Sequence, residues 1–235
     1  DSENPMIHDQ LINALSRLRL YEEAFQEREV SARRYGKNSS WYAANQDNDE
    51  AIDQATVLVE TALITSAQKF LRDARKAEDL FLAGDASKEA EAIALYTSAA
   101  DAYRRYLKQF PRSKNAYELK FFLAECLYGS RQLDEAAISY VEVVQDKSND
   151  RHLEKASWLA ALTREELVKT MARNGEVEAT RSIMGDEYEE PEKTDQEQTE
   201  NDNKLITIEP RPIPPVIQEL IDARLVYVNL DPKYR

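Results

Sequence analysis

The residue types that most often carry chemistry are scarce in this chain. Its 235 residues include two histidines, His8 and His152, and a single cysteine, Cys126. Zinc sites need closely spaced Cys and His, and nucleophile turns need flanking glycines, but neither pattern occurs. Carboxylates are abundant, and 44 Asp and Glu in one chain make any carboxylate pair uninformative about acid–base catalysis. We therefore expect no catalytic residue, no metal site and no cofactor, and hence no enzyme.

Structural roles explain these three residues more simply. His8 and His152 fall in the first turns of expected helices, where we expect surface positions. Cys126 lies among Leu123, Ala124 and Leu127, so we expect a small buried apolar side chain there.

Charge and hydropathy narrow the classes of partner. The 31 Lys and Arg against 44 Asp and Glu give a formal net charge of −13 at pH 7. Affinity for nucleic acid comes largely from cations that displace counterions, so we expect no nucleic-acid partner. Apolar residues make up 42% of the chain, which suffices for a folded core. No run approaches the roughly 18 apolar residues that suggest a membrane span.

The elements that must position any functional site are predicted to be helices, because apolar residues recur at helical spacing. Ile7, Leu11 and Leu18 recur at helical spacing on one face, and a longer stripe runs from Ile52 to Phe81. Each of the five glycines follows a segment of good helix formers, as is typical of helix ends. Only 205–209 looks extended, so the predicted fold class is all-α. The expected helices cover 6–34, 49–83, 87–110, 114–129, 133–146, 151–174, 176–184 and 214–230.

A repeat of small and aromatic residues runs through the middle of the chain. Ala99 and Tyr103 recur 37 residues later as Ala136 and Tyr140, and Ala124 recurs 36 residues later as Ala160. Small residues let two helix backbones approach, and an aromatic ring fills the space between neighbouring hairpins. We therefore predict these four alanines to lie in close helix–helix contact.

This pattern resembles the tetratricopeptide repeat family. The residues of the best repeat that lie at the family's spacing are Leu123, Ala124, Leu127, Ala136, Tyr140 and Val143. Two positions depart from the family pattern: Tyr106 stands where the family has a small residue, and Ser148 where it has a proline. The resemblance implies a solenoid of helical hairpins, here with long N-terminal helices. The stretch 103–113 is similar to repeats of bacterial cell-envelope proteins, including outer-membrane assembly components, and 40–45 to motility-complex proteins. A periplasmic location is thereby implied.

The expected organisation has four parts. A helix and connecting loop occupy 1–48, helical repeats 49–184, an acidic linker ending in prolines 185–213, and the start of a further repeat 214–235. Nine acids and two lysines fall within 185–204, and such a block is normally solvated. The chain begins at Asp1 without a basic, apolar leader, so any secretory signal has been removed or never existed.

The resemblance also implies a binding groove lined by the first helix of each hairpin. With Tyr117 at the first repeat position, the groove positions are Glu118, Phe121, Glu125 and Tyr128, followed by Glu154, Ser157, Ala161 and Arg164. The glutamates would repel a carboxylate, so a protein partner with a basic or apolar segment is expected. For Phe121 and Tyr128, packing against a neighbouring helix remains an equal alternative.

These features predict a non-catalytic protein–protein interaction scaffold in a bacterial cell-envelope complex, serving motility or outer-membrane assembly. Two alternatives stay open. One is a cytosolic acidic chaperone for secreted subunits, and the other is the helical-repeat portion of a cell-wall enzyme.

Overall fold

A computed structural model describes residues 4–187 and 212–230. The structure is 80% helical and has no strand among these residues, which confirms the all-α prediction. The expected extended segment 205–209 lies outside the described residues. The elements are α1 (Pro5–Arg17), α2 (Tyr21–Tyr35), α3 (Ser40–Ala44), α4 (Asp49–Leu82), the 3-10 turn η1 (Ala86–Lys88), α5 (Glu89–Gln109), α6 (Ala116–Gly129), α7 (Leu133–Gln145), α8 (Leu153–Arg173), α9 (Arg181–Met184), the 3-10 turn η2 (Gly185–Glu187) and α11 (Pro215–Leu230).

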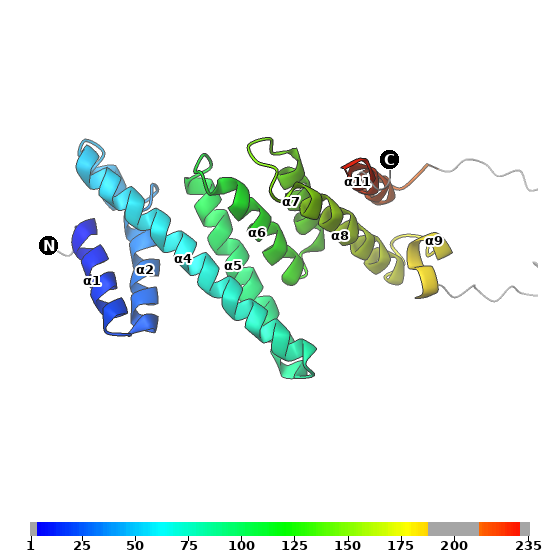
Figure 1. Cartoon of the computed structure of the whole chain (residues 1–235), viewed down its shortest axis with the longest axis horizontal. Helices are drawn as coiled ribbons and strands as arrows, with labels where there is room; N and C mark the ends of the chain where they lie inside the picture. Colours follow the sequence, from blue (N-terminus) through cyan, green and yellow to red (C-terminus); the bar gives the residue numbers. More distant parts are fainter. Residues whose placement is uncertain (1–3, 188–211, 231–235) are drawn as a thin grey trace, which may run out of the picture. The chain divides into compact units, whose positions relative to one another are not determined.

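The N-terminal segment is a hairpin rather than the single helix expected over 6–34. The chain reverses after α1, where Arg19 adopts the left-handed region with φ 61°. The amide of Leu20 donates to the carbonyl of Leu15 at 3.0 Å, which closes α1 as a Schellman-type cap does. α1 and α2 then pack side by side (Figure 1). The prediction failed because the helix end carries neither glycine nor proline, and the apolar spacing continues through the turn.

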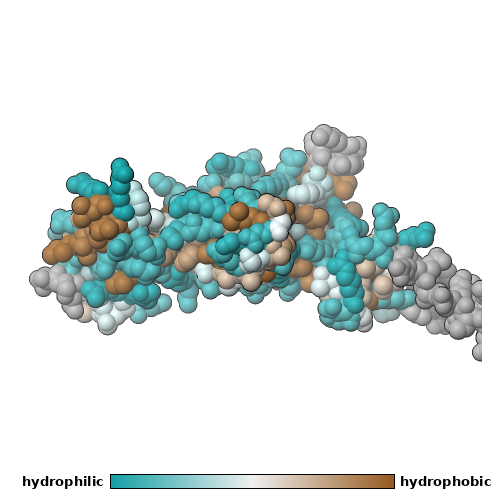
Figure 2. Space-filling view, turned by 90° about the horizontal axis from the view of Figure 1, so that it is seen from below, coloured by the Kyte–Doolittle hydropathy of each residue, from teal (hydrophilic) through white to brown (hydrophobic). Residues whose placement is uncertain are grey.

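The reversal also changes which face of α1 is buried. The expected apolar stripe is exposed, with Ile7 at 48%, Leu11 at 44% and Leu18 at 70% of their surface open. α1 instead buries Pro5, His8 and Ile12. Figure 2 shows apolar residues gathered on the surface around this part of the chain.

α4 is the central support of the N-terminal part. It packs against α2 on one side and along α5 on the other, as Figure 1 shows. Its buried face is rich in small residues, among them Ala55, Ala67 and Ala74, each with none of its surface exposed. Small side chains let the two long backbones approach closely, so the long stripe predicted from the sequence finds its long partner in α5.

The small-and-aromatic repeat packs as predicted over α5, α6 and α7, whereas close contact of Ala160 with these helices stays a prediction. Ala99 of α5, Ala124 of α6 and Ala136 of α7 are completely buried where these consecutive helices pack. The repeated tyrosines fill equivalent spaces, because Tyr103 contacts Phe122 and Tyr140 contacts Phe121, each with ring centroids 6.1 Å apart. The architecture is therefore all-α and repeat-like.

Two expected helix signals have other roles. Ser113 precedes the helix expected from 114, but α6 begins at Ala116; the Ser113 hydroxyl lies 2.7 Å from the Tyr106 hydroxyl and 3.0 Å from the Glu60 carboxylate. Gly129 does not end α6 in the left-handed conformation, which Arg131 adopts with φ 63°. Gly129 instead lies against the ring of Tyr96, where an added Cβ would come within 2.6 Å.

The chain divides into two compact units, 1–156 and 157–235, so neither predicted boundary at 48 or 184 coincides with the division. The first 48 residues belong with the repeats because α2 packs on α4. Within the second unit, α11 pairs with α8 through two ion pairs, Arg164–Glu219 at 3.0 Å and Arg224–Glu165 at 2.8 Å. Most of the predicted linker 185–213 lies outside the described residues.

Candidate functional site

The predicted groove residues divide between the two units. Glu118, Phe121, Glu125, Tyr128 and Glu154 belong to the first unit, on α6 and the first turn of α8. The remaining three belong to the second unit, and they are buried, with Ser157 at 1%, Ala161 at 8% and Arg164 at 7% exposed. With so little exposure these three side chains offer little surface to a partner, and their assignment to a groove stays a prediction. Arg164 turns instead to Glu219 of α11.

Phe121 is a packing residue, which decides between its two alternatives. Only 2% of its surface is exposed. Its ring stacks on that of His152, with centroids 4.2 Å apart and planes within 6° of parallel. The helix position that the family frame assigns to the groove is covered here by His152, the residue that precedes α8.

His152 is correspondingly not the surface residue expected from the sequence. Its side chain is 14% exposed, and it stacks on Tyr117 as well as on Phe121. Its backbone amide donates to the Tyr117 hydroxyl at 3.1 Å. Burial lowers the pKa of this imidazole, and the Glu118 carboxylate opposes that effect from 4.0 Å. The ring is therefore stacked on α6 immediately before α8 begins, in an environment that disfavours its charged form.

His8 is also buried, with 8% of its surface exposed. Its Nε2 lies 2.6 Å from a Glu27 carboxylate oxygen, and its ring meets that of Tyr35 edge to face. Both histidine predictions failed for one reason: the first turn of a helix is exposed only where no other helix covers it. Cys126 is fully buried as predicted, and burial raises the pKa of its thiol to about 12.

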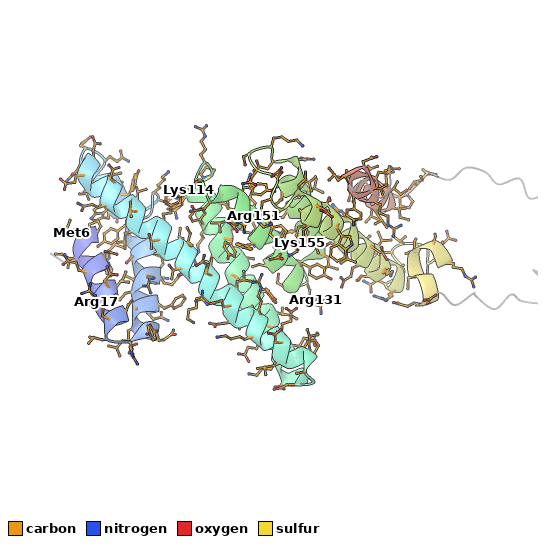
Figure 3. All side chains as sticks on the ribbon, in the orientation of Figure 1. Met6, Arg17, Lys114, Arg131, Arg151 and Lys155 are labelled. Carbon is orange, nitrogen blue, oxygen red and sulfur yellow. The ribbon has the colours of Figure 1, made fainter. Side chains whose placement is uncertain are left out.

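A row of three charged residues, which we call the ion-pair row, joins three helices. The Glu125 carboxylate of α6 lies 3.0 Å from Nη2 of Arg75 on α4 and 2.8 Å from Nζ of Lys155 on α8. Lys155 also lies 5.0 Å from the centre of the Phe121 ring, at cation–π distance. The row ties α4, α6 and the start of α8 together on one surface, where Figure 3 labels Lys155.

The glutamates on this surface are balanced by cations. Glu118 pairs with Arg151 at 3.3 Å, and Glu125 pairs with two cations in the ion-pair row. The acidic groove expected from the sequence is therefore a face of mixed charge, to which Tyr128 contributes a partly exposed ring. Arg75, Arg151 and Lys155 were missed because the family frame considers only the groove positions of each repeat, and α4 lies outside the repeat match.

Within 4–187 and 212–230, no three or more His, Cys, Asp or Glu side chains are grouped so that they could hold a metal ion. In the same ranges, no helix combines the length and the apolar character needed to cross a bilayer.

Comparisons with known proteins identified no relative of this chain. No family model, no curated protein and no solved structure matches this chain.

Proposed function

We propose that this chain is a non-catalytic protein-interaction scaffold of a bacterial cell-envelope complex. In this proposal a partner segment binds to the mixed-charge face formed by α4, α6 and the first turn of α8. The family resembled by 117–148 works in this way, and the similarity of 103–113 to envelope repeats is what favours the envelope location.

The observation that carries the proposal is the ion-pair row. The Glu125 side chain is only 18% exposed, and its carboxylate pairs with Arg75 of α4 and Lys155 of α8. The three helices therefore present these side chains in a fixed arrangement. A preformed face binds a partner with less loss of conformational freedom than a flexible one. Helical repeats use such surfaces for extended segments.

The chemistry of the face indicates how a partner would be held. The partly exposed Tyr128 offers amphipathic contact area of the kind enriched in binding hot spots. Glu118 and Arg151 at the edge are 41% and 68% exposed in their side chains, so they can exchange their mutual pair for partner charges of either sign. Such edge charges set specificity more than affinity.

Site-specific photo-crosslinking tests this proposal. A photoreactive phenylalanine analogue replaces Tyr128 in the full chain, and a matched variant carries it at Ile138, an exposed position on α7 that is 46% open. In cells of the source organism, we expect discrete protein adducts at position 128, recovered with the envelope fraction, and few at 138. Equal labelling at both positions would overturn the binding face, and adducts found only in the cytosolic fraction would overturn the envelope location.

A further inference from the structure

A second surface of the first unit is rich in cations, whereas the chain as a whole is acidic. Two adjoining hollows lie over the C-terminal end of α2, and they share Arg33 and Ser39. The smaller, of about 300 Å³, reaches α5 and is also lined by Arg105 and Lys108. The larger, of about 720 Å³, reaches α3 and is also lined by Arg34 and Trp41. We call this surface the basic hollow.

Cations outnumber carboxylates there. A Glu29 carboxylate oxygen lies 3.2 Å from Arg105 and 3.9 Å from Arg33, and the Glu29 side chain is 13% exposed. Lys37 adds a further cation beside this surface, since its Nζ donates to the Gln109 carbonyl at 3.1 Å. Lys108 makes no ion pair within the described ranges. The residues that line the two hollows include four cations, Arg33, Arg34, Arg105 and Lys108, and no carboxylate, in a protein whose net charge is −13.

Apolar side chains form part of the lining of the basic hollow, and we call them its apolar floor. Ala32 and Leu63 line the smaller hollow and Val30 the larger, while the Trp41 ring stands edge to face against Tyr35 at 4.9 Å between centroids. Arginine and tryptophan around an apolar floor are the composition of protein-binding hot spots. Arg112 and Lys114 lie in the loop after α5, where Figure 3 labels Lys114.

We propose that the basic hollow is a docking site for an acidic protein segment that inserts one aromatic or aliphatic side chain between α2, α3 and α5. Charge complementarity selects this occupant, because the guanidinium and ammonium groups of the rim would face its carboxylates. The apolar floor separates it from a nucleic acid, which would need cations spaced along a phosphate backbone. This site is separate from the mixed-charge face and would recruit a second partner.

Peptide binding to the full chain tests the proposal. The probe is a fluorescein-labelled 12-residue peptide of Glu and Asp around one Tyr; the comparison peptides replace the acids by Gln and Asn, or the Tyr by Ser. Anisotropy at low salt should show binding of the first peptide and at least tenfold weaker binding of both others. Equal binding of the Tyr-lacking peptide, or tighter binding of a labelled oligothymidylate, would overturn the assignment.

Charge-matched variants locate the site. Arg33→Glu with Lys108→Glu should weaken binding at least tenfold. The control, Arg17→Glu with Lys147→Glu, changes the net charge equally at exposed positions elsewhere and should weaken it less than threefold. Equal losses in the two double variants would show a nonspecific charge effect and overturn the site.

A milder pair of substitutions controls for misfolding of the charge-reversal variant. Arg33→Gln with Lys108→Gln, checked by circular dichroism, should still weaken binding at least threefold. In a Trp158→Phe background, peptide addition should also change Trp41 emission, and unchanged emission at saturation would refute docking beside Trp41. Failure of these tests leaves the crosslinking result at Tyr128 unaffected, so the two proposals are separately decided.

Discussion

The His152 ring is stacked on α6 and is largely shielded from water. Its ring lies on Phe121, which is itself buried, and its pKa is lowered because charging it would require desolvating the imidazolium. Glu118 and Glu125 favour the charged form, whereas Arg151 and Lys155 oppose it, so burial remains the largest influence. Stability should therefore respond to this one side chain when the pH falls.

The sign of that response follows from linkage. A histidine whose pKa is lower in the folded chain binds a proton more readily in the unfolded chain, so its contribution to stability is complete above about pH 6.5 and declines at lower pH. His152→Phe keeps a stacking ring but cannot be protonated. We expect the free energy of unfolding of the native chain, relative to this variant, to fall between pH 7 and pH 5 in urea titrations. The carboxylates titrate in both proteins and cancel, so parallel profiles would contradict the assignment.

At the scale of elements, α6 approaches α5 closely at Gly129. The Tyr96 ring occupies the space that any Cβ at this position would need, and the Tyr96 hydroxyl is anchored to Glu78 at 2.6 Å. The ring cannot move aside without losing that hydrogen bond. Glycine is thus required here by packing and not by a turn, which is a different reason from the helix-end role assigned from the sequence.

Gly129→Ala should therefore destabilise the chain, although alanine is the better helix former. We expect the clash to cost about 1–3 kcal/mol in chemical denaturation, as overpacked cores usually do. In a Tyr96→Leu background the same substitution should be close to neutral, because the ring is gone. A cost that is equal in both backgrounds would mean that Tyr96 does not limit this position.

At the scale of the whole molecule, the two compact units carry one tryptophan each. Trp41 lies in the first unit and Trp158 in the second, and the chain has no others. Repeat-like chains are stabilised by contacts between sequential neighbours, so a local defect should weaken one unit before the other.

Single-tryptophan variants measure this directly. In Trp158→Phe, fluorescence reports the first unit, and in Trp41→Phe it reports the second. Ile12→Ala, at a position 2% exposed in α1, should cost about 2–5 kcal/mol and lower the denaturation midpoint seen by Trp41 more than that seen by Trp158. Val168→Ala, at a fully buried position of α8, should do the reverse. Identical shifts in both reporters would show that the chain unfolds as one cooperative body.

The sequence by itself determined the helical class, the long α4 and the close packing at Ala99, Ala124 and Ala136, because helical spacing and residue size are local properties. It also predicted the burial of Cys126 from its apolar neighbours. Only the tertiary structure decided four other features. They are the reversal at Arg19, the stack of Phe121 on His152, the pairing of Glu125 with two cations, and the basic hollow. These features depend on how helices pack and on which side chains that are distant in the sequence come into contact. A pattern of hydropathy and charge along the sequence does not specify those contacts.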